Sequence, residues 1–209
     1  MGFYPLLLEL EGRPCLVVGG GPVGERKVEG LRAVGAAVTV VSPDLTPTLA
    51  SLAEAGRITH VARAYRDGDL DGAALVFTAL GDPRVTAAVA DEARRRGVWL
   101  NAADDPAHCT FILPAVVRRG PLTVAVASGG ATPALTRALR EHLETTLGPE
   151  WATLAELAAE ARRELRAAGR MADGDTWRRA LAPDVRALVA ERRVDDARRE
   201  LRARLVMPA

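Results

Sequence analysis

A glycine-rich turn that follows a short apolar run constrains this chain more than any other feature. The run Cys15–Val18 leads into GGGPVG, in which Gly19, Gly21 and Gly24 have the spacing GxGxxG. Such a turn uses its first glycine for a tight bend, its second for close approach to a pyrophosphate, and its third for packing of helix against strand. Because the spacing also arises by chance, the inference depends on the elements that flank it.

Apolar runs and helical stretches alternate from Arg13 to Asn101, which predicts a parallel sheet covered by helices. Gly35 is suited to end the first helix, and Asp82 before Pro83 is suited to begin the third. The expected strands cover residues 15–18, 38–41, 58–62, 75–78 and 99–101, and the expected helices cover 23–34, 47–55 and 83–96. These elements surround the glycines in the order of a dinucleotide-binding unit, against the alternative of a glycine turn without a ligand.

The pattern changes after Asn101. Two extended apolar segments, 111–117 and 122–127, are joined by a short link that predicts a hairpin. Thr132 before Pro133 predicts the start of a helix with one long apolar stripe, and residues 150–209 have helical spacing that is interrupted near 169–175. The expected fold class is α/β, with a Rossmann-type parallel sheet domain over 1–112, a small α+β dimerisation domain over 113–148, and a helical C-terminal domain over 149–209.

Composition excludes several functional classes. The chain has 28 basic and 27 acidic residues, so no overall field attracts nucleic acid or an anionic membrane. It has no signal-peptide start and no apolar run of about 20 residues, and we expect a cytoplasmic protein. Cys15 and Cys109 have no CxxC spacing and are expected to be reduced core thiols. We expect no metal site, because ligand spacing is missing at the three histidines, His60, His108 and His142.

The candidate dinucleotide site combines the glycine turn with the ends of neighbouring strands. NAD enzymes often hold the ribose with an acidic residue after the second strand, where this chain has Ser42, Pro43 and Asp44. Ser42 or Asp44 can bond the ribose, and no arginine follows to bind a 2′-phosphate, so we expect NAD and not NADP. The expected cofactor-binding residues are Gly19, Gly20, Gly21, Pro22, Val23, Gly24, Ser42, Pro43, Asp44, Thr78, Ala79 and Asn101.

Five sequence blocks carry a resemblance to a known family. LVVGGGPVGERK, VTVVSP, NAADDP, FILPAVVRRGPLTVAVASGG and TPALTRALR occur in this order, and residues 3–148 resemble the precorrin-2 dehydrogenase module of siroheme synthases. The resemblance implies an NAD-dependent enzyme that oxidises precorrin-2, a polycarboxylate macrocycle, to sirohydrochlorin for siroheme or cobalamin synthesis. It also implies a homodimer formed through the middle domain, and some members of the family insert ferrous iron as well.

The resemblance places the family's key aspartate at Asp104, in the block Asn101, Ala102, Ala103, Asp104. Local sequence favours the same residue, because Asp105 precedes Pro106 and can serve as a helix cap or turn residue. Asp104 has no such local role, and we expect it to act as the general base. The alternative is that both aspartates only shape a turn.

The candidate substrate-binding residues lie around the start of the helix at Thr132. Hydroxyl and backbone N–H groups there can hold a carboxylate, and guanidinium groups supply charge, although a plain capped loop and solvated arginines are the alternatives. The candidate basic partners are Arg118, Arg119, Arg137 and Arg140, and the expected set is Ser128, Gly129, Gly130, Thr132, Arg118 and Arg137. His108 is a weaker candidate for assisting metal insertion.

Three functions fit these residues. The first is the dehydrogenase, alone or with ferrochelatase activity. The second is an NAD-binding sensor without catalysis, in which Asp104 would have no function. The third is a chelatase that no longer oxidises its substrate, and the intact glycine turn argues against it.

Overall fold

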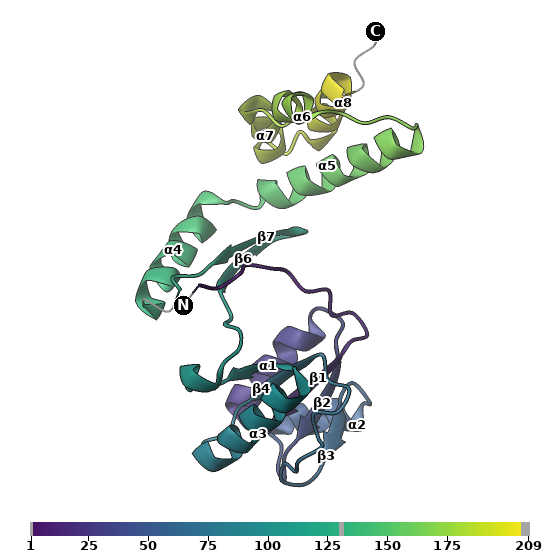
Figure 1. Ribbon diagram of the computed structural model, residues 1–209. Helices are drawn as coiled ribbons and strands as arrows, with labels where there is room; N and C mark the ends of the chain where they lie inside the picture. Colours follow the sequence, from purple (N-terminus) through teal and green to yellow (C-terminus); the bar gives the residue numbers. More distant parts are fainter. Residues whose placement is uncertain (1, 130–131, 206–209) are drawn as a thin grey trace. The chain divides into compact units, whose positions relative to one another are not determined.

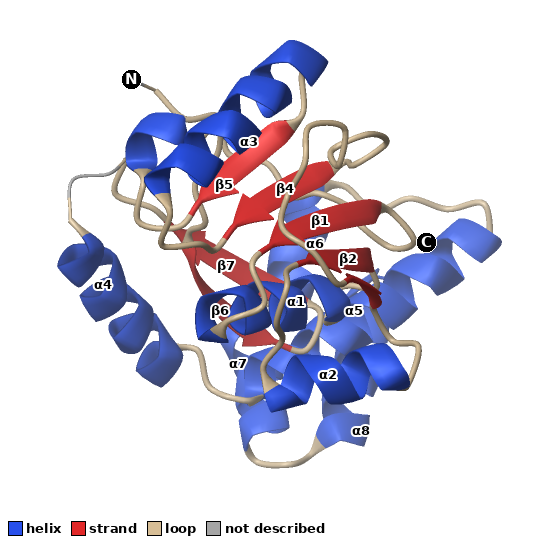
Figure 2. Cartoon of the chain, turned by 90° about the horizontal axis from the view of Figure 1, so that it is seen from below, coloured by secondary structure: helices blue, strands red, loops and turns tan. Residues whose placement is uncertain are grey.

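The computed structural model describes residues 2–129 and 132–205, which form two compact units, Met1–Ile112 and Leu113–Ala209. The first unit is an α/β sandwich whose five parallel strands have the order β3-β2-β1-β4-β5 (Figures 1 and 2). Its elements are β1 (Pro14–Val18), α1 (Pro22–Arg32), β2 (Ala37–Val41), α2 (Pro47–Glu54), β3 (Thr59–Val61), β4 (Leu75–Thr78), α3 (Pro83–Arg96), β5 (Trp99–Ala102) and the 3₁₀ helix η1 (Pro106–His108). The expected Rossmann-type sheet is confirmed.

Both faces of the sheet are apolar because helices cover both. Alternate residues of β1 point to opposite sides, as the period of a strand requires. Cys15 and Val17 pack with Val28 of α1 and Leu49 of α2, whereas Leu16 and Val18 pack with α3. A strand buried on both faces reads as a continuous apolar run, which is why the strands could be found from the sequence.

Side chains and backbone conformation set the helix ends close to the expected positions. The Asp82 carboxylate accepts a hydrogen bond from Arg84 N (2.9 Å), which confirms it as the cap of α3, and Gly97 ends that helix in the left-handed conformation. The first helix differs from its prediction, because α1 starts at Pro22 and ends at Arg32. Val34 lies beyond it and is 40% exposed, so it does not belong to the helix's apolar face.

A buried carboxylate ties the segment between β3 and β4 to α3. Glu92 is fully buried and accepts hydrogen bonds from Tyr65 Oη (2.6 Å), Gly68 N (2.9 Å) and Arg96 Nε (2.6 Å). Burial alone would raise the pKa of Glu92, but these three donors outweigh it and hold the pKa below its ordinary value. The loop and the helix are therefore held together by one ionised group.

The second unit begins with a hairpin and continues with helices. Its elements are β6 (Ala115–Arg119), β7 (Leu122–Val126), α4 (Pro133–Thr146), α5 (Glu150–Ala167), α6 (Gly174–Ala180), α7 (Pro183–Ala190) and α8 (Val194–Leu205). The antiparallel pairing of β6 and β7 confirms the hairpin. Its first strand starts later than expected, because Phe111 packs edge-on against Phe77 with ring centroids 5.5 Å apart and takes no part in the pairing.

The four helices after residue 149 share a core of their own. Leu154, Leu157, Ala161 and Leu165 of α5 are buried against apolar residues of the last three helices, and the break between α5 and α6 falls at the expected place. The separation of this region from residues 113–148 as a domain stays a prediction. Among the helices within residues 2–129 and 132–205, none has the length and apolar character that crossing a membrane requires.

Replacing Glu92 by Gln is expected to lower the free energy of unfolding by about 2 kcal/mol at pH 7, because the buried charge that accepts three hydrogen bonds is lost. The pKa of Glu92 is lower in the folded than in the unfolded chain, so the stabilisation is present above the ordinary carboxyl pKa and is lost as the pH falls through the folded value. The wild type and the variant should therefore converge in acid. Urea unfolding at several pH values measures this.

Asp91→Asn is the matched control for that measurement. Asp91 lies on the same helix, and its carboxylate is paired with Arg94 on the exposed surface. An exposed pair contributes little, and a change below about 0.5 kcal/mol is expected. An equally small effect of Glu92→Gln at pH 7 would contradict the importance assigned to the buried network.

Candidate functional site

The candidate site lies at the carboxyl ends of β1 and β4. These strands are neighbours in the sheet, but the chain leaves β1 towards β2 and leaves β4 towards β5, and open α/β sheets bind ligands in a crevice expected at such a point. Two backbone bonds fix the residues on either side of that expected crevice: Gly19 N donates to Val41 O (3.0 Å), and Ala79 N donates to Val18 O (2.8 Å). The structure thus brings the glycine turn together with the residues that follow β2 and β4.

Gly19 and Gly20 allow the turn to lie directly against its neighbours. Gly19 has a φ of 117°, and a Cβ there would lie 2.6 Å from the carbonyl oxygen of Ala79. A Cβ on Gly20 would collide with the carbonyl oxygen of Asp44, while the Gly20 oxygen accepts a hydrogen bond from Thr46 N (2.9 Å). Side chains at either position would separate the turn from the loops that form the crevice.

Gly24 and Gly21 have opposite surroundings. A Cβ on Gly24 would collide with the carbonyl oxygen of Gly19, so the missing side chain lets α1 start close beneath the turn. A Cβ on Gly21 would have no atom within 4 Å, so no protein packing explains a glycine there. Gly21 is the N-cap residue of α1, with extended backbone and no side-chain cap, and Pro22 follows as the first helical residue. Open space at a helix amino end suits an anionic group.

The segment after β2 closes one side of the crevice. Ser42 is 6% exposed, its hydroxyl lies on the side of Gly20, and its carbonyl oxygen accepts a hydrogen bond from His60 Nε2 (2.9 Å). Pro43 and Asp44 are exposed. Thr46 donates a hydrogen bond to Glu25 of α1 and also caps α2 by accepting from Leu49 N (3.2 Å). This link between α1 and α2 was not predicted, because its partners are far apart in the sequence.

A second group of polar residues lies at the end of β5. Asn101 is 8% exposed, and its amide donates to the carbonyl oxygen of Phe111 (3.1 Å). Its oxygen accepts from Lys27 Nζ of α1 (3.3 Å), and the same ammonium lies 5.5 Å from the centroid of the Phe77 ring. Cys109 accepts from Ala102 N at 3.2 Å. Sequence analysis expected Asn101 here but missed Lys27.

Asp104 occupies an unusual backbone position at this edge. Its φ is 58°, in the left-handed region that few residues other than glycine adopt, and its side chain is exposed. Within the described part of the chain its carboxylate has no hydrogen-bond or ion-pair partner, whereas the Asp105 carboxylate lies 2.6 Å from His108 Nδ1. The backbone of the turn is held by Ala103 N, which donates to Thr78 O (2.9 Å). A strained residue with an unpaired carboxylate is a candidate for chemistry.

The two cysteines are free, but only one is a core residue. Cys15 is 2% exposed within β1, and burial raises the pKa of its thiol. Cys109 is partly exposed beside Asn101, so the expectation of a core thiol is wrong for it. Burial is the main cause that raises its pKa, with a smaller contribution from the charge of Asp105. The contacts of Cys109 with the end of β5 could not be predicted from the residues next to Cys109 in the sequence.

The candidate substrate-binding residues of the second unit make local contacts. The Ser128 hydroxyl donates to Thr132 O (3.3 Å) and accepts from Thr132 N (3.3 Å), which closes the loop before α4. Thr132 caps α4 by accepting from Ala134 N (3.2 Å), as expected. Gly129 is exposed with a φ of 63°, and Gly130 lies outside the described residues. Ser128 and Thr132 are thus linked to each other at the amino end of α4.

The four candidate arginines differ in what they already bind. Arg119 donates to the carbonyl oxygens of Leu147 (2.6 Å) and Glu144 (2.7 Å), so it caps the end of α4. Arg137 and Arg140 form ion pairs with glutamates one turn along α4. Arg118 is exposed and has no ion pair among residues 2–129 and 132–205. Arg118 therefore has the guanidinium that is most available to a ligand.

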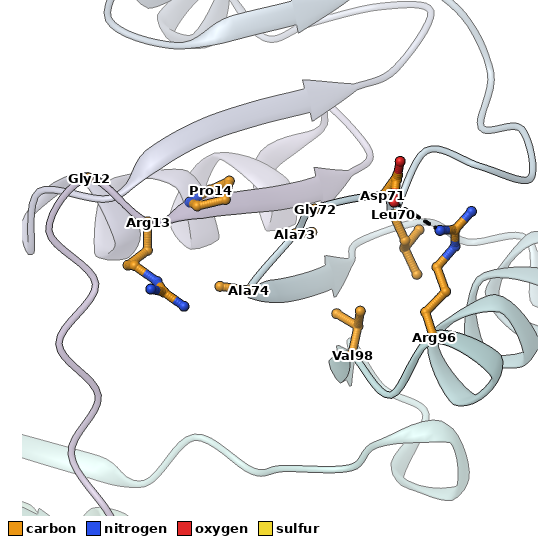
Figure 3. Close-up of a pocket in the computed structure, with 10 residues that line it drawn as sticks. All are labelled: Gly12, Arg13, Pro14, Leu70, Asp71, Gly72, Ala73, Ala74, Arg96 and Val98. Atoms are coloured by element: carbon orange, nitrogen blue, oxygen red, sulfur yellow. Dashed lines mark hydrogen bonds and ion pairs between the residues drawn. The ribbon is translucent and has the colours of Figure 1, made fainter.

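Two further observations concern what lies outside the candidate site. A pocket of about 790 Å³ lies at the opposite edge of the sheet, before β1, β4 and β5, where Arg96 is paired with Asp71 at 3.1 Å (Figure 3). It contains none of the candidate site residues. Among the residues that the structure describes, no three His, Cys, Asp or Glu side chains are grouped as metal ligands would be.

Comparison with known proteins agrees with this geometry. Residues 6–115 match the family described as "Putative NAD(P)-binding", which spans the sheet, the glycine turn and the β5 turn. The chain belongs to this family. Residues 119–146, which cover most of the hairpin and α4, match the family described as "Sirohaem biosynthesis protein central". The predicted resemblance to siroheme synthases is confirmed.

Individual relatives point the same way. The chain is 49% identical over 162 residues to siroheme synthase of Methylobacillus flagellatus, with 78% of this chain and 35% of that protein covered. It is 40% identical over 203 residues to siroheme synthase of Methylococcus capsulatus, with 96% and 43% covered. The chain thus spans less than half the length of these relatives. The solved structure of "SirC, precorrin-2 dehydrogenase" has the same fold, with a TM-score of 0.75, 24% identity, and 95% of this chain and all of that chain covered.

Replacing Gly21 by Ala tests the glycine turn as a binding surface. The extended backbone and the open space accept a methyl group, so the melting temperature should stay within about 2 °C of the wild type. The methyl group would occupy the space expected for the pyrophosphate, and the Kd for NAD should rise at least about tenfold. Thermal unfolding and fluorescence titration with NAD measure the two effects.

Gly24→Ala is the comparison variant, because its methyl group would meet the carbonyl oxygen of Gly19. It should lower the melting temperature by displacing α1, whether or not NAD is present. If Gly21→Ala bound NAD as tightly as the wild type, the turn would not be the pyrophosphate site.

Proposed function

We propose that this chain catalyses the NAD-dependent dehydrogenation of precorrin-2 to sirohydrochlorin, with Asp104 as the general base. The observation that carries the proposal is the Asp104 carboxylate, which is exposed, unpaired among the described residues, and held in left-handed backbone at the same sheet edge as the glycine turn. The family relationship and the names of the siroheme synthase relatives support the choice of substrate.

The residues around the turn fit a nicotinamide dinucleotide. Gly21 offers open space at the amino end of α1, where backbone N–H groups and the helix dipole favour a pyrophosphate. Ser42 and Asp44 follow β2, where a ribose hydroxyl would be bound, and no arginine replaces them. This favours NAD over NADP, because a 2′-phosphate would meet the Asp44 carboxylate without a compensating cation.

The reaction removes two electrons and two protons from the macrocycle, as one hydride and one proton. NAD, when bound, accepts one hydrogen as a hydride. Asp104 accepts the other as a proton and releases it to water, so the balance is substrate plus NAD⁺ giving product, NADH and H⁺. The turn that holds Asp104 is fixed by the Ala103–Thr78 backbone bond, and this positions the carboxylate without using its oxygens.

The second unit supplies candidate groups for the substrate's carboxylates. Ser128, Gly129 and Thr132 lie at or shortly before the amino end of α4, and Arg118 is exposed and has no ion pair among residues 2–129 and 132–205. Arg137 is 77% exposed at its side chain and would exchange its Glu141 partner for a substrate carboxylate at little cost. These assignments rest on chemistry and on the family, and Gly130 is kept in the set on the same grounds.

We also propose that the chain acts as a homodimer. No residue of α4 is buried, and Leu135 and Leu139 on its apolar stripe are 50% and 43% exposed. Apolar side chains at helical spacing that stay exposed mark an interaction surface. A second copy of this chain is the occupant that the family relationship favours.

Asp104→Asn is the direct test of the catalytic role. Asparagine tolerates left-handed backbone as aspartate does, so the turn should keep its shape. The kcat for NADH formation from precorrin-2 and NAD under anaerobic conditions should fall about 100-fold to 10,000-fold, because the base is lost. The Kd for NAD should change less than about threefold.

Asp105→Asn is the control, because it alters the neighbouring carboxylate that is already bound to His108. It should keep at least about a third of the wild-type kcat. If the wild type bound NAD but formed no NADH, the chain would be an NAD-binding sensor. Incubating the same preparation with sirohydrochlorin and ferrous iron or cobalt, and measuring metal insertion, would detect a chelatase.

Leu139→Glu tests the dimer. A charge on the apolar stripe of α4 should shift the molar mass in solution from that of two chains to that of one, since an unpaired carboxylate is costly in an interface. Sedimentation of the wild type and of Ala138→Glu, an exposed change one residue away, provides the comparison. A wild-type protein that sediments as a single chain at micromolar concentration would refute the dimer.

A further inference from the structure

The one lysine of the chain lies inside the candidate site. Lys27 follows Gly24 by three residues and precedes Leu31 by four, and both of these are buried, so the helix period turns Lys27 towards the sheet. Its ammonium donates to Asn101 Oδ1 (3.3 Å) and lies 5.5 Å from the centroid of the Phe77 ring. The next residue back, Arg26, is exposed. A charged group is thus directed inwards where the helix could have placed it in water.

The surroundings of Lys27 disfavour the charged form of its side chain. Burial is the main cause that lowers its pKa from the ordinary value, and the charge of Arg26 lowers it further. The charges of Cys109 and Asp104 act in the opposite direction, although Asp104 makes no direct ion pair with it. An ammonium has three N–H donors, and only the Asn101 oxygen is recorded as an acceptor among the described residues.

We propose that Lys27 is a positioning residue for Asp104: it holds Asn101 near the end of β5, three residues before Asp104, and supplies positive charge near the base. Asn101 is bonded at both ends, to Lys27 and to the Phe111 carbonyl, so it cannot rotate without losing both. Left-handed backbone at a residue other than glycine is unfavourable and persists only when its surroundings hold it. Lys27 contributes to that hold from α1.

The charge of Lys27 has a second effect, which rests on the proposed function. A substrate with many carboxylates brings negative charge towards an anionic base, and like charges repel. A cation beside Asp104 offsets this repulsion and keeps the base ionised when the substrate excludes water. Lys27 is suited to this because its ammonium binds Asn101, and it makes no bond with the Asp104 oxygens among the described residues.

Kinetics separate a positioning role from a merely structural one. Lys27→Met should lower kcat about 10-fold to 100-fold while the Kd for NAD changes less than about threefold, and Lys27→Arg, which keeps the charge, should recover part of the loss. Arg26→Met removes the same charge from the exposed neighbour and should leave kcat unchanged. In the Asp104→Asn background, Lys27→Met should cost less than about threefold, because both changes affect one group. Independent, multiplicative losses would overturn the proposal.

A spectroscopic measurement tests the contact without any turnover. Reductive ¹³C-methylation labels Lys27 as the single lysine, and the signal that Lys27→Arg removes identifies it apart from the amino terminus. The signal should titrate at a pH below that of an ordinary lysine, and Asp104→Asn should move its pKa lower still, since the Asp104 charge raises it. Asp105→Asn should move it less.

The spectroscopic experiment on Lys27 and the activity assay can fail independently of each other. A Lys27 signal that titrates like an ordinary lysine and ignores Asp104→Asn would overturn the proposal even if the enzyme turns over. A wild-type protein without dehydrogenase activity, but with a shifted and Asp104-dependent Lys27 signal, would overturn the proposed function and leave the contact established.

Discussion

The structure depends on how closely the backbone after β1 approaches the loops after β2 and β4. Gly19 lies against the Ala79 carbonyl and Gly20 against the Asp44 carbonyl, and neither contact leaves room for a side chain. The same close approach brings the amino end of α1 to the crevice and puts Gly24 beneath Gly19. A crevice with one open backbone position, Gly21, follows directly. Gly19, Gly20 and Gly24 therefore serve packing, and Gly21 is the position proposed to face the pyrophosphate.

The chemistry of the site is collected at the sheet edge by the parallel strands. Because their carboxyl ends meet, Asn101 near the end of β5 and Asp104 in the turn that follows lie at the edge that carries the glycine turn after β1. Lys27 joins the two from α1, since its ammonium binds Asn101. Among the described residues the Asp104 carboxylate has no partner, whereas the neighbouring Asp105 is paired with His108. The Asp104 oxygens are therefore available for the proposed role as general base.

The sheet, its helices and the hairpin could be predicted because their signals are local. Buried strands are continuous apolar runs, and Asp82 and Thr132 cap their helices through hydrogen bonds to the next few residues. The contacts that the sequence did not reveal join distant residues: Lys27 with Asn101, Glu25 with Thr46, and Cys109 with the β5 turn. Arg119 was a candidate substrate ligand because its contact with the end of α4 also joins distant residues and could not be predicted. Only the uniqueness of Lys27 and its place in the block LVVGGGPVGERK hinted at its position.

A crystal structure of the protein with NAD would decide whether the proposed function is right. In that case the pyrophosphate lies against the open face of Gly21 and the nicotinamide ring at the ends of β4 and β5, with the Asp104 carboxylate on the side of the ring where a substrate can enter. A dinucleotide bound elsewhere, for example in the pocket at the amino ends of the strands, would contradict it, as would an Asp104 carboxylate turned away from the ring.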